Sequence, residues 1–157
     1  MARVVAVGRP HHVTQRGNRR LPTFFRENDY RLYLDLMAEW CCKFGLEIWE
    51  YCLMTNHVHL VAVPEREESL ARAVGEVHRR YTSLVNKRKG WTGHLWQGWF
   101  GSFVMDESHL LAAARYIERN PVSAGMVTAP GGYEWSSAAF IWRLGMMPWS
   151  RWLLCCP

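Results

Sequence analysis

The chain has 157 residues, of which 49% are hydrophobic and 21% are charged. These values are typical of one folded domain and exclude a disordered tail or a multidomain assembly. Lysine and arginine exceed aspartate and glutamate by 19 to 14, and the resulting charge of +5 favours a polyanionic partner without identifying one. We expect a single domain over residues 1–157, with about residues 143–157 forming a C-terminal extension of unassigned role.

The five cysteines fall in two adjacent pairs and one single position, without a C-x-x-C spacing: Cys41, Cys42, Cys52, Cys155 and Cys156. This arrangement suits neither a disulfide framework nor a zinc knuckle, and it favours a reducing compartment. No stretch approaches the ~18 apolar residues that a membrane span needs, and the apolar run near the N-terminus is too short for a signal peptide. We therefore expect a soluble, cytoplasmic protein.

Apolar periodicity divides the chain into strands and amphipathic helices. The first three expected elements are a strand at 9–15, followed by a basic turn, and then a helix from 27 to 44 and a strand at 46–53. The next four are a strand at 57–63, a helix at 69–87, a strand at 100–105 and a helix from about 107 to the Asn120-Pro121 pair. Gly45 and Pro121 mark helix ends, because glycine favours a left-handed terminus and proline disfavours helical geometry before it.

This order of elements is the split β-α-β pattern of the ferredoxin-like, or RRM-like, α+β fold. We expect an antiparallel sheet with helices packed on one face, and an extra C-terminal helix that carries Tyr116. In the 69–87 helix, the apolar stripe predicted to face the core consists of Leu70, Val74, Val77, Tyr81 and Leu84.

The most informative motif is His57-Val58-His59. Side chains alternate along a strand, so the two histidines project from one face while Val58 points to the other. Two converging imidazoles make most of a divalent-metal site, and neutral imidazole is a good ligand near pH 7. Taken alone, the pair is more often explained by local hydrogen bonding beside the turn than by a metal site.

A second motif, YIERNP at residues 116–121, lies on the last expected helix. Tyr116 and Asn120 are four residues apart and so share one helix face. The phenol of Tyr116 can serve as a nucleophile, and the amide oxygen of Asn120 can complete a metal's ligand set. A core tyrosine followed by an asparagine cap explains the same residues, so the motif alone leaves both interpretations open.

Five ordered blocks carry a resemblance to a known family: GRPHHVTQRGNRR at 8–20, YCLMTNHVHLVAVP at 51–64, GHLWQGWF at 93–100, YIERNPVSAGMV at 116–127 and YEWSS at 133–137. In these blocks the sequence resembles the HUH single-tyrosine transposases and, among them, the REP-associated tyrosine transposases (RAYT), relatives of small insertion-sequence transposases. The resemblance implies that His57, His59 and Asn120 are the metal ligands. It also implies that Tyr116 is the catalytic tyrosine.

The same resemblance implies a metal-dependent endonuclease and strand transferase that cuts single-stranded DNA near hairpin-forming repeats. A tyrosine phenol is mostly protonated at neutral pH, so Mg²⁺ or Mn²⁺ would assist by offsetting charge on the scissile phosphate and orienting it for attack. The product would be a 5′-phosphotyrosine link and a free 3′-OH. The expected partner is hairpin DNA of the repetitive extragenic palindrome type, bound by a monomer or a homodimer.

Basic residues in two segments are the predicted DNA contacts, and such contacts to phosphate make binding salt-dependent. The basic residues are Arg16, Arg19 and Arg20 in the first segment, and Arg79, Arg80, Lys87, Arg88 and Lys89 in the second; the polar Asn18 of the first segment is a further predicted contact. Trp91, Trp96 and Trp99 are candidates for stacking on unpaired bases. The chain departs from the family pattern at Trp99, where Arg is usual, and at Thr55, where Pro is frequent.

Three alternatives stay open. A noncatalytic nucleic-acid-binding module can share the split β-α-β plan, although the central strands lack an aromatic RNP-type run. A metal-binding or redox protein using the cysteines is disfavoured by their adjacent spacing. Tyr81 is a rival nucleophile, but its place on the apolar stripe favours the core.

Of His11 and His12, one is expected to face the same sheet surface as His57 and His59.

Overall fold

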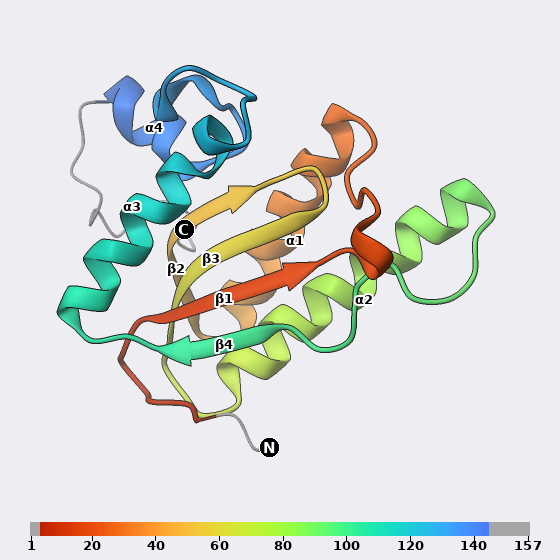
Figure 1. Ribbon diagram of the computed structural model, residues 1–157. Helices are drawn as coiled ribbons and strands as arrows, with labels where there is room; N and C mark the ends of the chain where they lie inside the picture. Colours follow the sequence, from red (N-terminus) through yellow and green to blue (C-terminus); the bar gives the residue numbers. More distant parts are fainter. Residues whose placement is uncertain (1–3, 145–157) are drawn as a thin grey trace.

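The computed structural model describes residues 4–144, and its centre is one four-stranded sheet (Figure 1). The strands are β1 (His11–Arg16), β2 (Leu46–Leu53), β3 (His57–Pro64) and β4 (Gly101–Val104). Their order in the sheet is β2-β3-β1-β4, and every neighbouring pair is antiparallel. This is the sheet expected for a split β-α-β fold, because β3 lies between β1 and β2, which run in the same direction.

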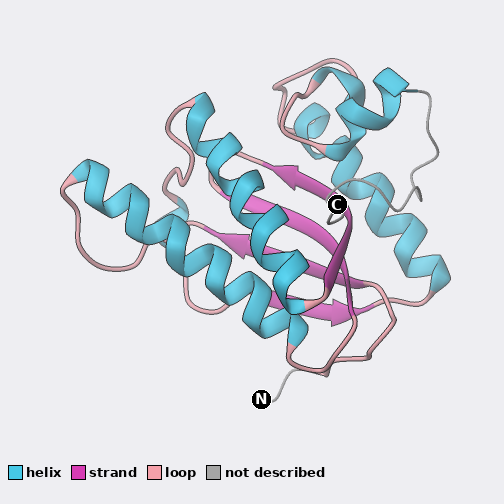
Figure 2. Ribbon diagram, turned by 180° about the vertical axis from the view of Figure 1, so that it is seen from behind, coloured by secondary structure: helices cyan, strands magenta, loops and turns pink. Residues whose placement is uncertain are grey.

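Two long helices cover one face of the sheet, α1 (Glu27–Phe44) and α2 (Ser69–Lys89) (Figure 2). Between them and the sheet lies the larger core, which includes Val13, Val58 and Leu60 from the central strands. The opposite face carries α3 (Glu107–Ser123). Helix α4 (Ser137–Leu144) begins beside the edge strand β2, where Leu53 N donates to the carbonyl of Trp135. A smaller core there joins β2 and β3 to α3 through residues such as Cys52 and Ile117.

The end of α1 agrees with the prediction at Gly45, and the end of α3 differs from the prediction at Pro121. Gly45 and Gly90 end α1 and α2 with left-handed backbone, at φ of 66° and 68°. The expected stop at Asn120-Pro121 is wrong, because α3 continues through the buried Pro121 to Ser123. The preference of a residue before proline is a bias only, and the last turn is completed by bonds such as that from Ala124 N to Asn120 O.

Three further details depart from the expected elements. On α2 the core stripe ends at Val85, which is buried, whereas Leu84 is 44% exposed. The basic turn contains a short 3-10 helix, η1 (Asn18–Arg20), and a second one, η2 (Pro130–Gly132), precedes α4. Helix α4 was not among the expected elements. The C-terminal extension expected at about residues 143–157 lies outside the described residues, apart from the last two residues of α4.

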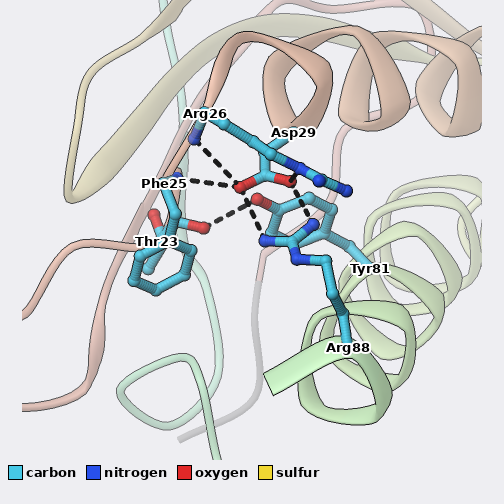
Figure 3. A network of polar contacts seen from close by, with 6 residues as sticks. All are labelled: Thr23, Phe25, Arg26, Asp29, Tyr81 and Arg88. Carbon is cyan, nitrogen blue, oxygen red and sulfur yellow. Dashed lines mark hydrogen bonds and ion pairs between the residues drawn. The ribbon is translucent and has the colours of Figure 1, made fainter.

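An ion pair between the buried carboxylate of Asp29 and the partly exposed Arg88 joins the start of α1 to the end of α2 (Figure 3). The carboxylate of Asp29 accepts two hydrogen bonds from the Arg88 guanidinium, at 2.5 and 3.0 Å, and two more from the backbone N–H groups of Phe25 and Arg26. Burial raises the pKa of Asp29, but these bonds outweigh burial and hold that pKa below its usual value. The pair fixes the loop that leads into α1.

This loop reaches the turn before the histidine motif. Tyr81 on α2 donates its hydroxyl hydrogen to the carbonyl of Thr23 at 2.7 Å (Figure 3). The backbone N–H of Thr23 in turn donates to the carbonyl of Thr55, at 2.9 Å. The side chain of Tyr81 is completely buried, so Tyr81 packs in the core and is not available as a nucleophile.

Candidate functional site

The histidines of β3 lie on the sheet face opposite α1 and α2. Val58 and Leu60 enter the larger core, so the alternation of the strand directs His57 and His59 to the face covered by α3. The two imidazole rings are 5.0 Å apart between centroids and nearly perpendicular. The sequence therefore predicted correctly that the two rings share one face.

His12 from β1 joins this pair. In the register of the sheet His12 lies opposite Val61, which makes it a diagonal neighbour of His59. The two rings stack with centroids 5.3 Å apart, and His12 Nε2 lies 3.1 Å from His59 Nδ1. Its neighbour His11 instead turns to the other face, where it is fully buried and its Nδ1 contacts the carbonyl of Arg9.

Asn56 orients the other histidine. Its Oδ1 lies 2.7 Å from His57 Nδ1 and accepts a hydrogen bond from that ring nitrogen, while its Nδ2 donates to the carbonyl of Arg20 at 3.0 Å. Because Asn56 Oδ1 accepts a hydrogen bond from His57 Nδ1, the neutral His57 ring carries its proton on Nδ1 and its lone pair on Nε2. The same side chain ties the β2–β3 turn to the basic turn.

Helix α3 places Tyr116 and Asn120 over His59. The Tyr116 ring lies edge-on to the His59 ring, with centroids 5.5 Å apart, and 57% of Tyr116 is exposed. One helical turn later, Asn120 Nδ2 lies 3.4 Å from His59 Nε2. The face of α3 that carries Ala113 and Ile117 packs on the smaller core, which fixes the height of the helix above the sheet.

All three histidines are held neutral. Burial is the largest cause that lowers the pKa of His59 to about 3, and the neighbouring charges of His57, His12 and Arg16 add to it. Burial also lowers the pKa of His12 and, together with Arg16, that of His57, although a bond with Asn120 opposes the shift in His57. Neutral imidazoles keep a lone pair for a metal ion at neutral pH.

The donor set fits a divalent cation. Nδ1 of His57 and Nδ1 of His59 are both engaged by neighbours, so each ring has Nε2 left as a ligand, and the Asn120 amide lies in contact with that nitrogen of His59. Two imidazoles and an amide oxygen suit Mg²⁺, Mn²⁺ or Zn²⁺. Over the described residues, no three His, Cys, Asp or Glu side chains group as a metal site.

An open pocket of about 400 Å³ adjoins the two histidines. It is lined by Thr14, Gln15, Arg16, His57, Val58, His59, Gln97 and Gly101. Arg16 lies opposite His57 in the β1–β3 ladder, is exposed, and forms no ion pair within residues 4–141. The pocket therefore offers a cation beside the histidines, as a phosphate-binding site requires.

The predicted DNA-contact residues separate into two groups. Arg16 and the exposed residues of η1 follow β1 at the edge where β3 begins, beside His57; these are Asn18, Arg19 and Arg20. Arg19 and Arg20 both have left-handed backbone, at φ of 55° and 60°. This uncommon conformation is held by the bond between the Asn56 side chain and the carbonyl of Arg20.

The second group lies on α2, on the other face of the sheet. Glu76 forms ion pairs with both Arg79 and Arg80, and the Arg80 guanidinium also lies 4.1 Å from the centroid of Trp40. Arg88 binds Asp29, and the Lys89 ammonium lies 4.2 Å from the Phe25 ring centroid. The structure thus gives several of these side chains internal partners and leaves Lys87 exposed. Their contacts to DNA stay predictions.

Sequence reasoning did not assign a role to Asn56, and it left open which of His11 and His12 belongs to the site. The signal for Asn56 was its place immediately before the histidine motif, where a side-chain amide can hydrogen-bond a neighbouring group. The signal for His12 was only its strand phase. Which residue it meets depends on the pairing of β1 with β3, which local patterns do not determine.

The fold and this site define a class of α+β protein in which one face of a ferredoxin-like sheet carries a histidine pair and an adjacent helix supplies a tyrosine. The chain belongs to the family of IS200-like transposases, whose family model matches residues 8–120. That span includes both histidines, Tyr116 and Asn120. The expectation that the chain is related to the small insertion-sequence transposases is therefore confirmed.

Two solved structures share the fold. A REP-associated tyrosine transposase bound to a REP hairpin superposes with a TM-score of 0.79 at 19% sequence identity, covering 97% of this chain and 89% of the other. A putative transposase from Deinococcus radiodurans R1 gives a TM-score of 0.52 at 22% identity, covering 76% of this chain and 95% of the other. No curated protein matches this chain. The expected ferredoxin-like α+β architecture is thus confirmed.

No helix in the described part of the chain combines the length and the apolar character that crossing a membrane requires.

Proposed function

We propose that this protein is a metal-dependent endonuclease and strand transferase that acts on single-stranded DNA beside hairpin-forming repeats. The observation that carries the proposal is that Tyr116 and Asn120 both contact the same histidine, His59. A nucleophile and a metal ligand one helical turn apart on α3 meet the metal-binding face of the sheet. Such placement serves in-line attack on a phosphodiester.

The reaction proposed for Tyr116 is a transesterification. Its phenolic oxygen attacks the phosphorus of the scissile phosphodiester, a new O–P bond forms, and the bond to the 3′ oxygen breaks. The phenol gives up one proton and the departing oxygen takes one up, so the strand ends as a 5′-phosphotyrosine and a free 3′-OH. A second 3′-OH can reverse the step on a new partner strand, because the covalent link conserves the energy of the original bond.

His57, His59 and Asn120 are proposed to hold Mg²⁺ or Mn²⁺. When bound there, the ion would offset negative charge on a non-bridging phosphate oxygen. The protein's own contribution is orientation, since His12 and Asn56 each engage the Nδ1 atom of one ligand histidine and leave its Nε2 for the ion. Arg16, at the rim of the pocket, is proposed to bind a phosphate of the same strand.

Hairpin DNA of the REP type is the proposed substrate. The solved transposase with the same fold is bound to a REP hairpin. The exposed arginines beside His57, Arg16, Arg19 and Arg20, provide a surface for the backbone of such DNA. The protein is proposed to act as a monomer or as a homodimer. A cytoplasmic location fits access to chromosomal DNA.

The test uses a hairpin oligonucleotide with single-stranded flanks, labelled at one end. Incubation with Mg²⁺ or Mn²⁺ should give a shortened labelled strand and a protein–DNA adduct that survives denaturation, and EDTA should abolish both. The His57→Ala variant should still bind the oligonucleotide and fail to cleave it. Binding without cleavage by the wild-type protein, on every repeat tested, would favour the noncatalytic nucleic-acid-binding module instead.

A further inference from the structure

A second cavity, of about 380 Å³, lies between α2 and the segment that leads into β4. Its walls include Gly75, His78 and Thr82 from α2, and Trp96, Trp99 and Phe100 from the segment. The volume falls within the range of ~300–1,000 Å³ that is typical of small-ligand pockets. The predicted site residues leave this cavity unused, apart from Arg79 at its wall and the two tryptophans.

The cavity and the histidine pocket share one wall. Gln15 lines both of them, while Gln97 and Gly101 face the histidine pocket and the residues between them face the second cavity. Backbone bonds from Asn18 N to Leu95 O and from Gln97 N to Arg16 O hold this segment against the end of β1, each at 2.8 to 2.9 Å. A strand of DNA that leaves the histidine pocket therefore meets the second cavity one loop away.

The cavity is built for a flat ligand. Trp96 stacks on His78 with centroids 4.7 Å apart, and together they form a buried aromatic wall. Trp99 is 80% exposed, which is unusual for an indole at the edge of a mostly apolar cavity. Arg79 is the charged residue among the lining side chains, and it is already paired with Glu76 at 2.6 Å. These features favour a neutral aromatic ligand over a phosphate.

The hydrogen-bonding role of His78 is assigned from its contact with a buried tyrosine. Its Nε2 lies 2.8 Å from the hydroxyl of Tyr33, which is completely buried. A buried hydroxyl that fails to donate is costly, so Tyr33 donates to Nε2 and the single proton of the neutral imidazole is on Nδ1. Burial lowers the pKa of His78 to about 3, consistent with this neutral form. A ligand at His78 is therefore expected to present an acceptor atom.

We propose that this cavity binds one unpaired nucleobase of the DNA strand whose phosphate lies at the His57–His59 pocket. The inference rests on the proposed function for its ligand, and it adds a base-specific subsite formed by Trp96, Trp99 and His78. Nucleobases are flat and neutral and carry ring or carbonyl acceptors, which match the aromatic walls and the Nδ1–H donor. The subsite would select a base flanking the cleavage point.

The test measures binding alone, in EDTA, so that its outcome does not depend on cleavage. A fluorescent hairpin oligonucleotide with single-stranded flanks is compared with a series in which one flank base at a time is replaced by an abasic spacer. For the wild-type protein, one or two adjacent positions should weaken binding about fivefold or more when the base is removed. In Trp99→Ala this base dependence should disappear, while the other positions stay unchanged.

Two further variants sharpen the result. A Cβ at Gly75 would meet no atom within 4 Å, so Gly75→Leu should fill the cavity without disturbing α2 and should also abolish the base dependence. Phe140→Ala is the matched control, because Phe140 is an exposed aromatic residue on α4 and lies outside the cavity lining. Both Trp99→Ala and Gly75→Leu are checked by circular dichroism for retained folding.

Photocrosslinking locates the base. Iodouracil placed at the sensitive position should crosslink to a peptide that contains residues 94–100 or His78, as identified by mass spectrometry. The inference is overturned if no flank position depends on its base, if Trp99→Ala and Gly75→Leu keep the wild-type dependence, or if the crosslink lies elsewhere. A protein that shows the base dependence but never cleaves DNA would retain this subsite and lose the proposed function.

Discussion

His12 Nε2 and His59 Nδ1 lie 3.1 Å apart in stacked rings that come from neighbouring central strands. His12 is therefore not a ligand candidate itself. By engaging Nδ1 of His59, it leaves Nε2 of that ring facing Asn120 on α3. This arrangement of a ligand histidine and a partner behind it is common around bound metal ions, where the partner fixes the ring's orientation and tautomer.

Loss of the His12 contact should weaken the metal binding proposed for His57, His59 and Asn120. We expect His12→Ala to lower the affinity for Mn²⁺ by about 10–100-fold, because His59 loses the partner that fixes its ring. His12→Gln, which can still accept a hydrogen bond, should recover part of the loss. Titration calorimetry with Mn²⁺ checks this, with the exposed His109→Ala as control. Equal affinity in His12→Ala and wild type would show that His12 does not position His59.

The ion pair of Asp29 and Arg88 should be the most sensitive polar contact for stability. Arg88→Met removes two hydrogen bonds from the buried Asp29 carboxylate and leaves Arg26, at 3.5 Å, as its remaining cation, so we expect a loss of about 1.5–3 kcal/mol in the free energy of unfolding. The exposed pair of Arg66 and Glu68 provides the control, since Arg66→Met should cost no more than about 1 kcal/mol. Urea unfolding followed by tryptophan fluorescence measures both; similar values for the two variants would contradict a structural role for Arg88.

The same pair has a pH dependence of defined sign. Because the pKa of Asp29 is lower in the folded protein than its usual 3.8, the folded state holds fewer protons there than the unfolded chain. Its contribution to stability is therefore present above pH ~4 and is lost as the pH falls through the lowered pKa. Asp29→Asn should remove this acid-dependent loss, which unfolding curves between pH 6 and pH ~2 can test.

Glu50 should have the opposite dependence. It is buried beneath α3, where burial and then the nearby charge of Glu118 raise its pKa from 4.5 to about 9. The folded protein keeps a proton that the unfolded chain has lost, so stability falls as the pH rises from about 4.5 to about 9. Glu50→Gln should gain stability over wild type progressively through this window. The exposed Glu39→Gln should follow wild type; an unchanged profile in Glu50→Gln would exclude a buried neutral carboxyl.

The basic turn should account for part of the salt dependence of DNA binding. If Arg19 and Arg20 each contact a phosphate, the double change to alanine should reduce the slope of log affinity against log salt by about 0.7 per lost contact. Arg31→Ala, an exposed arginine on α1, removes a charge on the other face of the sheet and should leave the slope unchanged. Fluorescence anisotropy over a salt series measures the slope, and equal slopes for all three proteins would place the DNA elsewhere.

Much of this arrangement follows from local patterns. The alternation of His57, Val58 and His59, and the four-residue spacing of Tyr116 and Asn120, each bring two side chains to one face of one element. Gly45 ended a helix as its backbone freedom predicts. Such features are decided within a few residues, so one sequence is enough to predict them.

Other features depend on contacts between distant segments. The meeting of His12 with His59 needs the register of β1 against β3, and the position of Tyr116 over His59 needs α3 to pack on the smaller core. Pro121 continues a helix because its neighbours bury it there, against its local preference. The cavity at Trp99 exists only because the segment before β4 is bonded to the end of β1.

The most direct test of the central claim is the identity of the residue that becomes linked to DNA. The adduct formed with a hairpin oligonucleotide in Mn²⁺ is digested with protease and nuclease, and the modified peptide is sequenced by mass spectrometry. We predict a nucleotide on Tyr116, no adduct in EDTA, and none in Tyr116→Phe, which should fold normally because the hydroxyl of this exposed tyrosine has no hydrogen-bond partner among the described residues. An adduct on any other residue, or one that persists in Tyr116→Phe, would contradict the account.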